Sequence, residues 1–201
     1  LALSVHHPVP RLTWGVHVGT ASTLVTADQL AEVPIAVSRL NSGSHLAALA
    51  YARSKGWARN EHAIEVVNDL PGAVERLKSP APAVFFWEKY TTKHLVDDGT
   101  FRCVDEYRAS WPAFVIVASE AALAEHPKEI QRLLKVIRDQ AAGLMQKKTA
   151  PEVIAQRYKL SVEDAKTWFS GVKWNTGGPV DVEAMKRVVA DLENAGMLPD
   201  G

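Results

Sequence analysis

Short apolar runs alternate with helix-like segments over the first 118 residues of the chain. The β-prone runs predict strands at residues 12–18, 35–39, 64–67, 83–87, 101–104 and 113–118. Between them the spacing predicts helices near residues 45–54, 68–78 and 91–96, and a short helical turn near 27–30. The run from Ala83 to Trp87 has no polar alternation, which predicts a strand buried on both faces. Strands alternating with helices predict an α/β sheet.

The pattern changes to helices alone after Ser119. Apolar side chains recur with a period close to 3.6 residues at Ile130, Leu133, Leu134, Ile137, Ala141, Leu144 and Met145. Further helices are predicted to begin near Thr149, Ser161 and Asp181, whose side chains can cap free N–H groups. We therefore expect a helical C-terminal part after the α/β part.

A small-residue loop joins the strand predicted at 35–39 to the next helix. Arg39 stands at the end of the strand, and the loop then runs through Ser42, Gly43, Ser44 and His45. Ser44 is the predicted N-cap. The amides of a helix N-terminus and a planar guanidinium are suitable donors for a small anionic or polar ligand. The same residues are also consistent with a well-capped turn and a surface arginine.

This loop carries a resemblance to a known family. The motif is Ser38-Arg39-x-x-Ser42-Gly43-Ser44-His45, with Lys55-Gly56-Trp57 at the end of the following helix, and further similar segments lie at 12–17, 85–90 and 110–114. With these motifs the chain resembles solute-binding proteins of the sulfonate/nitrate/taurine ABC-transporter type, in a branch allied to the thiamine-pyrimidine synthases. The resemblance implies the type II periplasmic-binding-protein fold, in which two α/β lobes enclose a ligand cleft.

The resemblance also implies how the lobes divide. Residues 1–33 would hold a crossover strand and the remnant of lobe one, 34–110 would form lobe two, and 111–201 would hold the return strand and the helical part of lobe one. Residues 12–18 and 113–118 are then expected to be neighbouring strands. The family's opening βαβα units have no counterpart before Leu1. We therefore expect that the natural protein is longer at its N-terminus, or that another chain supplies the missing sheet. Without either, these 201 residues should expose apolar surface and self-associate.

Further ligand-binding candidates lie at or near the ends of the predicted strands. Trp87 and Glu88 end a buried strand, where ligands of parallel α/β sheets gather. The alternative is that Trp87 fills core and that Glu88 pairs with Lys89 or Arg102. Further candidates on or beside the two crossover strands are Trp14, His17 and Trp111, although an aromatic residue at such a place is more often part of the core.

Composition narrows the function classes. The 201 residues contain 23 Lys and Arg and 23 Asp and Glu, so no basic excess favours a nucleic-acid partner. The sole cysteine, Cys103, permits neither an intrachain disulfide nor a multi-cysteine zinc site. The seven histidines, His6 and His7 among them, show no metal-binding spacing, and no nucleotide-binding or serine-hydrolase motif is present. We expect no metal, no cofactor and no catalytic residue.

The leading hypothesis is a non-enzymatic binding protein for a small polar, anionic or heteroaromatic solute. It would serve the membrane subunit of an ABC transporter or act as a stand-alone sensor, and would be periplasmic in the first case and cytoplasmic in the second. The chain begins without a signal-peptide pattern, which leaves localisation open. One alternative is an enzyme of thiamine-pyrimidine synthesis, although one cysteine cannot form the cysteine-rich motif of those fungal enzymes. The other is the ligand-sensing domain of a transcription factor.

Overall fold

A computed structural model describes residues 2–5, 8–9, 12–57, 64–109, 111, 114–174 and 180–198. The chain divides into two compact units, which are described separately. The first contains residues 1–12 and 110–187, and the second contains residues 13–109 and 188–201. Residues 13–19, which the sequence analysis assigns to the segment 1–33, form an internal strand of the second unit's sheet.

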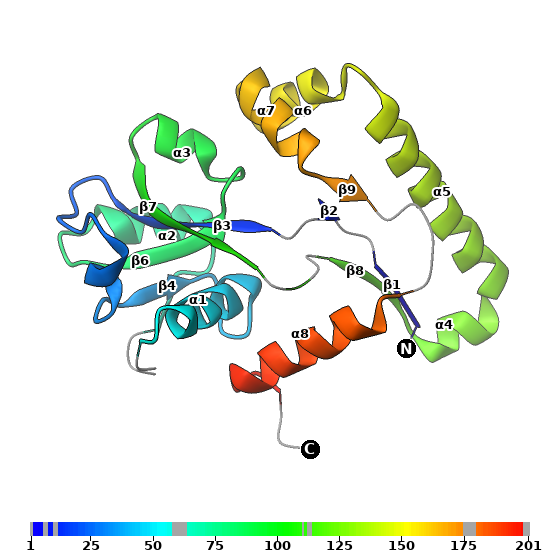
Figure 1. Cartoon of the computed structure of the whole chain (residues 1–201), viewed down its shortest axis with the longest axis horizontal. Coiled ribbons are helices and arrows are strands. Elements are labelled where there is room, and N and C mark those ends of the chain that lie inside the picture. Colours follow the sequence, from blue (N-terminus) through cyan, green and yellow to red (C-terminus); the bar gives the residue numbers. More distant parts are fainter. Residues whose placement is uncertain are drawn as a thin grey trace. The chain divides into compact units, whose positions relative to one another are not determined.

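The second unit is built on a mixed five-stranded sheet (Figure 1). Its strands, in spatial order, are β5 (Ile64–Val66), β4 (Ile35–Val37), β6 (Val84–Glu88), β3 (Thr13–Gly19) and β7 (Phe101–Arg108). Strand β4 runs parallel to β5 and β6, whereas β3 runs antiparallel to β6 and β7. The carboxyl ends of β4, β5 and β6 therefore share one edge of the sheet with the start of β3. Parallel α/β sheets bind ligands at this edge.

The helices of this unit cover both faces of the sheet. Helix α1 (Gly43–Ser54) packs on one face, where Tyr51 joins Val16 and Phe86 in a buried cluster. Helices α2 (Leu70–Lys78) and α3 (Lys93–Asp97) pack on the other face, around Phe85 and Phe101. A 3₁₀ turn, η1 (Ala27–Leu30), precedes β4. The prediction that residues 83–87 form a strand buried on both faces is confirmed, because side chains of β6 enter both clusters.

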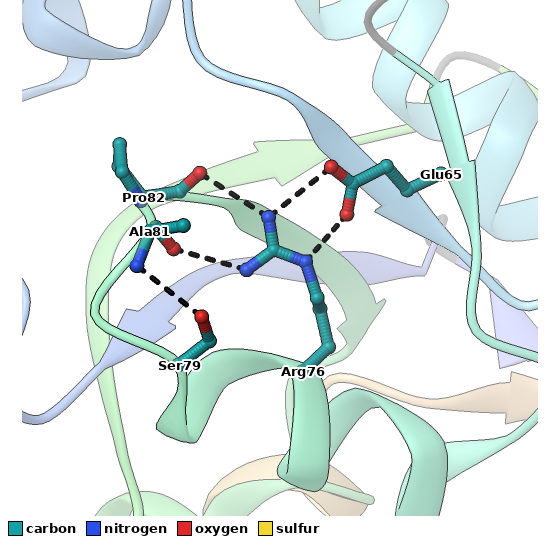
Figure 2. Close-up of polar contacts among 5 residues, drawn as sticks. All are labelled: Glu65, Arg76, Ser79, Ala81 and Pro82. Carbon is teal, nitrogen blue, oxygen red and sulfur yellow. Dashed lines mark hydrogen bonds and ion pairs between the residues drawn. The ribbon is translucent and has the colours of Figure 1, made fainter.

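Arg76 on α2 ties the helix to β5 and to the loop that leads into β6 (Figure 2). Its guanidinium donates two hydrogen bonds to the Glu65 carboxylate, from Nε at 2.5 Å and from Nη2 at 3.1 Å. It also donates to the carbonyl oxygens of Ala81 and Pro82. A planar guanidinium can satisfy all these acceptors at once, which a lysine cannot do. Arg76 therefore fixes the approach to β6.

The first unit contains two small sheets and four complete helices among its described residues. Strand β1 (Ala2–Val5) pairs antiparallel with β8 (Val115–Ala118), and β2 (Pro8–Val9) pairs antiparallel with β9 (Lys173–Trp174). The helices are α4 (Glu120–Glu125), α5 (Pro127–Gln146), α6 (Ala150–Tyr158) and α7 (Val162–Ser170). Helix α8 (Val182–Asn194) begins in this unit and ends in the second. None of the helices in the described parts of the chain is long and apolar enough to cross a membrane.

The core of the first unit lies mainly between α6 and α7, around Ile154 and Ala165. Apolar side chains on and near β8 and on α5 are exposed instead: Phe114, Val115, Val117, Leu133 and Val136. Exposure of apolar surface in this part of the chain agrees with the sequence-based expectation for Leu133. Of the other residues of the α5 stripe, Ala141 is buried, and the rest, such as Ile130 and Ile137, are half-buried.

The predicted pairing of residues 12–18 with residues 113–118 is wrong. Strand β3 pairs with β6 and β7, whereas the partner of β8 is β1, with Ala2 opposite Ala118 and Val5 opposite Val115. The physical reason is burial, since Val16 and Val18 on one face of β3 and His17 on the other are at most 1% exposed. Such a strand is internal to its sheet. Residue 113 lies outside the described residues, as do His6 and His7.

Candidate functional site

The loop between β4 and α1 lies at the edge of the five-stranded sheet where β4, β5 and β6 end. Helix α1 begins at Gly43, and Ser42 is its N-cap, with extended backbone angles and a side-chain oxygen that accepts from the His45 N–H at 3.3 Å. The prediction of Ser44 as the N-cap is wrong. Asn41 adopts a left-handed conformation, with φ of 58°, and this turns the chain two residues earlier than expected.

Three buried serine hydroxyls hold the loop together. The Ser44 oxygen accepts from the backbone N–H of Ser38 at 3.2 Å and lies 3.3 Å from the Ser38 hydroxyl and 3.0 Å from the Ser42 hydroxyl. All three serines are 6% exposed or less. The Ser44 side chain therefore faces inward and fixes the loop on the end of β4. Any role it has toward a ligand must come from its backbone N–H.

His45 also contributes to the shape of the loop. Its Nδ1 accepts a hydrogen bond from the Asn41 N–H at 3.0 Å. The neutral ring consequently carries its proton on Nε2. The side chain is 8% exposed, which is consistent with a residue that supports the left-handed turn at Asn41. His45 makes a further interaction within the chain.

The first two amides of α1 are not used by the hydrogen bonds of the loop. Among the described residues, the N–H groups of Gly43 and Ser44 have no hydrogen-bond acceptor, whereas those of His45 and Leu46 bond to Ser42. The positive end of the helix dipole adds to the attraction for an anion. Arg39, four residues before Gly43, is exposed and adds a full positive charge near this helix start.

Trp14 borders the same turn from β3. Its ring packs against Gly43, because a Cβ atom at position 43 would lie 3.3 Å from Trp14 Cη2 and 3.5 Å from Cζ2. Trp14 stands directly opposite Glu88 of β6 and Tyr107 of β7 in the sheet. Its indole Nε1 is buried and has no hydrogen-bond partner among the described residues. The structure thus brings together Trp14, Gly43 and the serine loop.

Glu88 lies at this edge but is occupied by its own turn. Its carboxylate accepts from the Thr91 N–H at 2.8 Å and from the Thr91 hydroxyl at 2.6 Å. The predicted alternative partners differ, since Lys89 pairs with Glu106 at 2.6 Å and Arg102 donates to backbone carbonyls near residue 22. Glu88 therefore orders the turn after β6.

Trp87 lies on the face of the sheet away from the α1 loop. Neighbouring residues of a strand point to opposite faces, so Trp87 points to the face covered by α2, where it stacks on Phe85 at a ring distance of 5.3 Å. Helix α1 and its loop lie on the other face. Trp111 belongs to the first unit and is half-buried there.

A polar network holds the far end of α1 on the sheet. The Tyr51 hydroxyl donates to Asp105 at 2.7 Å, and the Lys55 ammonium lies 2.9 Å from the same carboxylate. Burial and the hydrogen bond to Asp105 raise the pKa of Tyr51. Burial acts to raise the pKa of Asp105, but hydrogen bonds from Lys55 and Tyr51 outweigh it and lower that pKa. The helix that presents the free amides is therefore anchored at its C-terminal end.

His17 is a structural residue on the opposite face of the sheet. Its Nδ1 donates to the Phe85 carbonyl oxygen at 3.3 Å, and its Nε2 lies 3.1 Å from the Thr92 hydroxyl. Burial lowers its pKa to about 4, so the ring is neutral at pH 7. In the described part of the chain no group of three or more His, Cys, Asp or Glu side chains is placed to hold a metal ion.

Some features of the loop are missing from the sequence-based prediction. Ser38 anchors the serine cluster, and Asn41 sets the turn. Asn41 has a recognisable signal, since asparagine tolerates the left-handed region better than most residues. No sequence signal identifies the unpartnered indole of Trp14.

Known proteins support the fold of the chain. A family model described as Ca3427-like PBP matches residues 14–107, somewhat less than half of the chain. The Candida albicans CA3427 gene product, which exhibits the generic periplasmic binding protein structural fold, is 22% identical, with a TM-score of 0.88 over 99% of this chain and 68% of that one. No curated protein sequence matches.

Two sulfonate-binding proteins have similar structures. The alkanesulfonate-binding protein SsuA from Xanthomonas axonopodis pv. citri, bound to MOPS, is 18% identical, with a TM-score of 0.72 over 98% of this chain and 70% of that one. The aliphatic sulphonate binding protein SsuA from Escherichia coli is 16% identical, with a TM-score of 0.65 over 97% of this chain and 63% of that one. The resemblance seen in the sequence is thus confirmed for the fold. This chain has the type II periplasmic-binding-protein fold.

Proposed function

We propose that this protein binds a small anionic solute at the N-terminus of α1. The observation that carries the proposal is the pair of unpartnered amides at Gly43 and Ser44, which lie at the ligand-binding edge of the sheet with Arg39 close in sequence. The buried serine cluster keeps these donors in place before a ligand arrives. Preorganised donors lower the free-energy cost of binding.

A sulfonate is the solute class that we favour. A sulfonate group offers three oxygen atoms to donors that converge on one point, and it keeps its charge throughout the physiological pH range. Two proteins of similar structure are named as sulfonate-binding proteins, one of them bound to MOPS. Identities of 16–18% support the fold, and the ligand class for this chain rests on the donors of the α1 loop.

We further propose that binding is the whole task of the site. Of the described titratable side chains, His45 is engaged by Asn41 through Nδ1 and Glu88 by Thr91. These hydrogen bonds, at His45 Nδ1 and Glu88 Oε2, orient the two side chains within the loop and the turn after β6, which supports a structural role for them. Delivery of the solute to the membrane subunit of an ABC transporter fits this role, and a stand-alone sensor is the alternative.

Calorimetric titration with MOPS tests the proposal. Arg39→Ala should weaken MOPS binding by about 1.5–3 kcal/mol, the scale of a hydrogen bond to a charged group. Arg53→Ala is a matched control, because Arg53 is an exposed arginine in the last turn of the same helix. Morpholine, which lacks the sulfonate, should not bind. No measurable affinity for MOPS, or equal affinity in the wild type and Arg39→Ala, would refute a sulfonate site at this loop.

A further inference from the structure

The indole N–H of Trp14 is a buried donor without an acceptor. Of the described buried side-chain nitrogen and oxygen atoms, Trp14 Nε1 alone has less than 1 Å² exposed and no hydrogen-bond partner. Native proteins leave few such groups, because an unsatisfied buried donor carries the full cost of its lost hydration. The N–H of Trp14 is therefore a candidate hydrogen-bond donor to a ligand.

The position of the indole points to the α1 loop. Its Cζ2 and Cη2 atoms face Gly43, the first residue of α1, and Nε1 is separated from Cζ2 by a single ring carbon. The donor thus lies beside the helix turn whose own amides, at Gly43 and Ser44, have no acceptor among the described residues. Three N–H groups from β3 and α1 therefore lie in one neighbourhood.

Side-chain acceptors of the sheet and of the loop are held by other donors. Glu88, the residue opposite Trp14, accepts both hydrogen bonds from Thr91 on its Oε2 atom, and these orient the carboxylate toward its own turn. The Ser42 and Ser44 oxygens bond to each other and accept backbone N–H groups of His45 and Ser38. None of these oxygen atoms accepts a hydrogen bond from the indole.

We infer that an oxygen atom of the bound solute accepts the hydrogen bond from Trp14 Nε1. The inference rests on the proposed function and adds a specificity-determining donor to it. Trp14 then acts as a donor in the wall of the site and selects solutes that place an oxygen beside Gly43. Because Nε1 has less than 1 Å² exposed, its cover moves when the solute enters. The free protein carries the cost of the unsatisfied donor, and binding removes that cost.

Trp14→Phe tests this role, because it removes the N–H and keeps an aromatic ring. MOPS affinity should fall about tenfold or more, the ratio expected when one hydrogen bond to the ligand is lost. The midpoint of urea unfolding of the free protein should not fall through the loss of a hydrogen bond, because the donor that is removed has no partner there and its burial cost is removed with it. Trp57→Phe is the matched control, because Trp57 packs on Tyr51 near the other end of α1.

A spectroscopic readout separates a direct hydrogen bond from a change of shape. In ¹⁵N-labelled wild-type protein, the indole N–H resonance of Trp14 should shift downfield on saturation with MOPS, while that of Trp57 stays in place. Equal affinities for wild type and Trp14→Phe, or an unmoved Trp14 resonance at saturation, would overturn the inference and leave the proposed function standing. A wild-type protein that does not bind MOPS would overturn both. If Trp14→Phe does not fold, the resonance decides.

Discussion

Acidification should destabilise the second unit through His17. Its ring is 1% exposed and has a pKa of about 4 in the folded protein, against 6.5 in the unfolded chain. Burial is the main cause, and it outweighs the hydrogen bonds and the charge of Glu106, which favour protonation. Between pH 6.5 and pH 4 the unfolded chain binds a proton that the folded protein does not, so stability is lost as the pH falls through this window.

The size of the effect follows from the two pKa values. At 1.36 kcal/mol for each pH unit, the full difference is about 3 kcal/mol, and about 2 kcal/mol of it should be lost between pH 7.5 and pH 5. Hydrogen exchange of β3 and β6 amides in urea reports the stability of this unit alone. His17→Gln should be less stable at pH 7.5, because Gln fits the Phe85 and Thr92 partners less well, and should lose this part of the pH dependence.

A direct titration gives the decisive result for His17. The imidazole resonances of His17 should titrate near pH 4 in the folded protein. A midpoint near pH 6.5, or the same pH dependence of stability in wild type and His17→Gln, would show that burial does not control this residue.

Two further changes test the parts that hold the site. Ser42→Ala removes the N-cap of α1, so it should lower the free energy of urea unfolding by about 1 kcal/mol and weaken MOPS binding. Ser54→Ala, at the other end of the helix, should leave MOPS binding unchanged. Equal MOPS affinity in both variants would contradict the role of Ser42. Arg76→Gln removes the paired hydrogen bonds to Glu65, so it should lower the free energy of unfolding by about 1–2 kcal/mol and leave MOPS affinity unchanged. Unchanged stability would mean that the contacts drawn in Figure 2 contribute nothing measurable.

Much of the fold is predictable from the sequence, because periodicity identifies elements that bury one or both faces. The run at 83–87 and the capped helix at 70–78 are examples. Strands β1, β2 and β9 escape prediction, since two to four residues are too few for a period to appear. The pairing of β8 with β1 instead of β3 is a tertiary choice that no local pattern encodes.

The sequence predicts the position of the loop before α1, but it does not predict which residue caps the helix or which side chains face the loop. Small residues after a strand correctly indicate the loop before α1, yet the N-cap is Ser42 because Asn41 turns left-handed. Alternation along β6 separates Trp87 from Glu88, but only the packing of α1 decides which of them shares a face with the loop. The orphaned indole of Trp14 depends on the absence of an acceptor, which requires all neighbours in space to be known.

Backbone amide shifts during a MOPS titration test the central claim most directly. If the solute binds at the N-terminus of α1, the ¹H–¹⁵N resonances of Gly43 and Ser44 should move together in a saturable way, and their curves should give the affinity found by calorimetry. Arg39→Ala should displace both curves to higher MOPS concentration. Saturable binding with the largest shifts elsewhere and none at Gly43 and Ser44 would contradict the account.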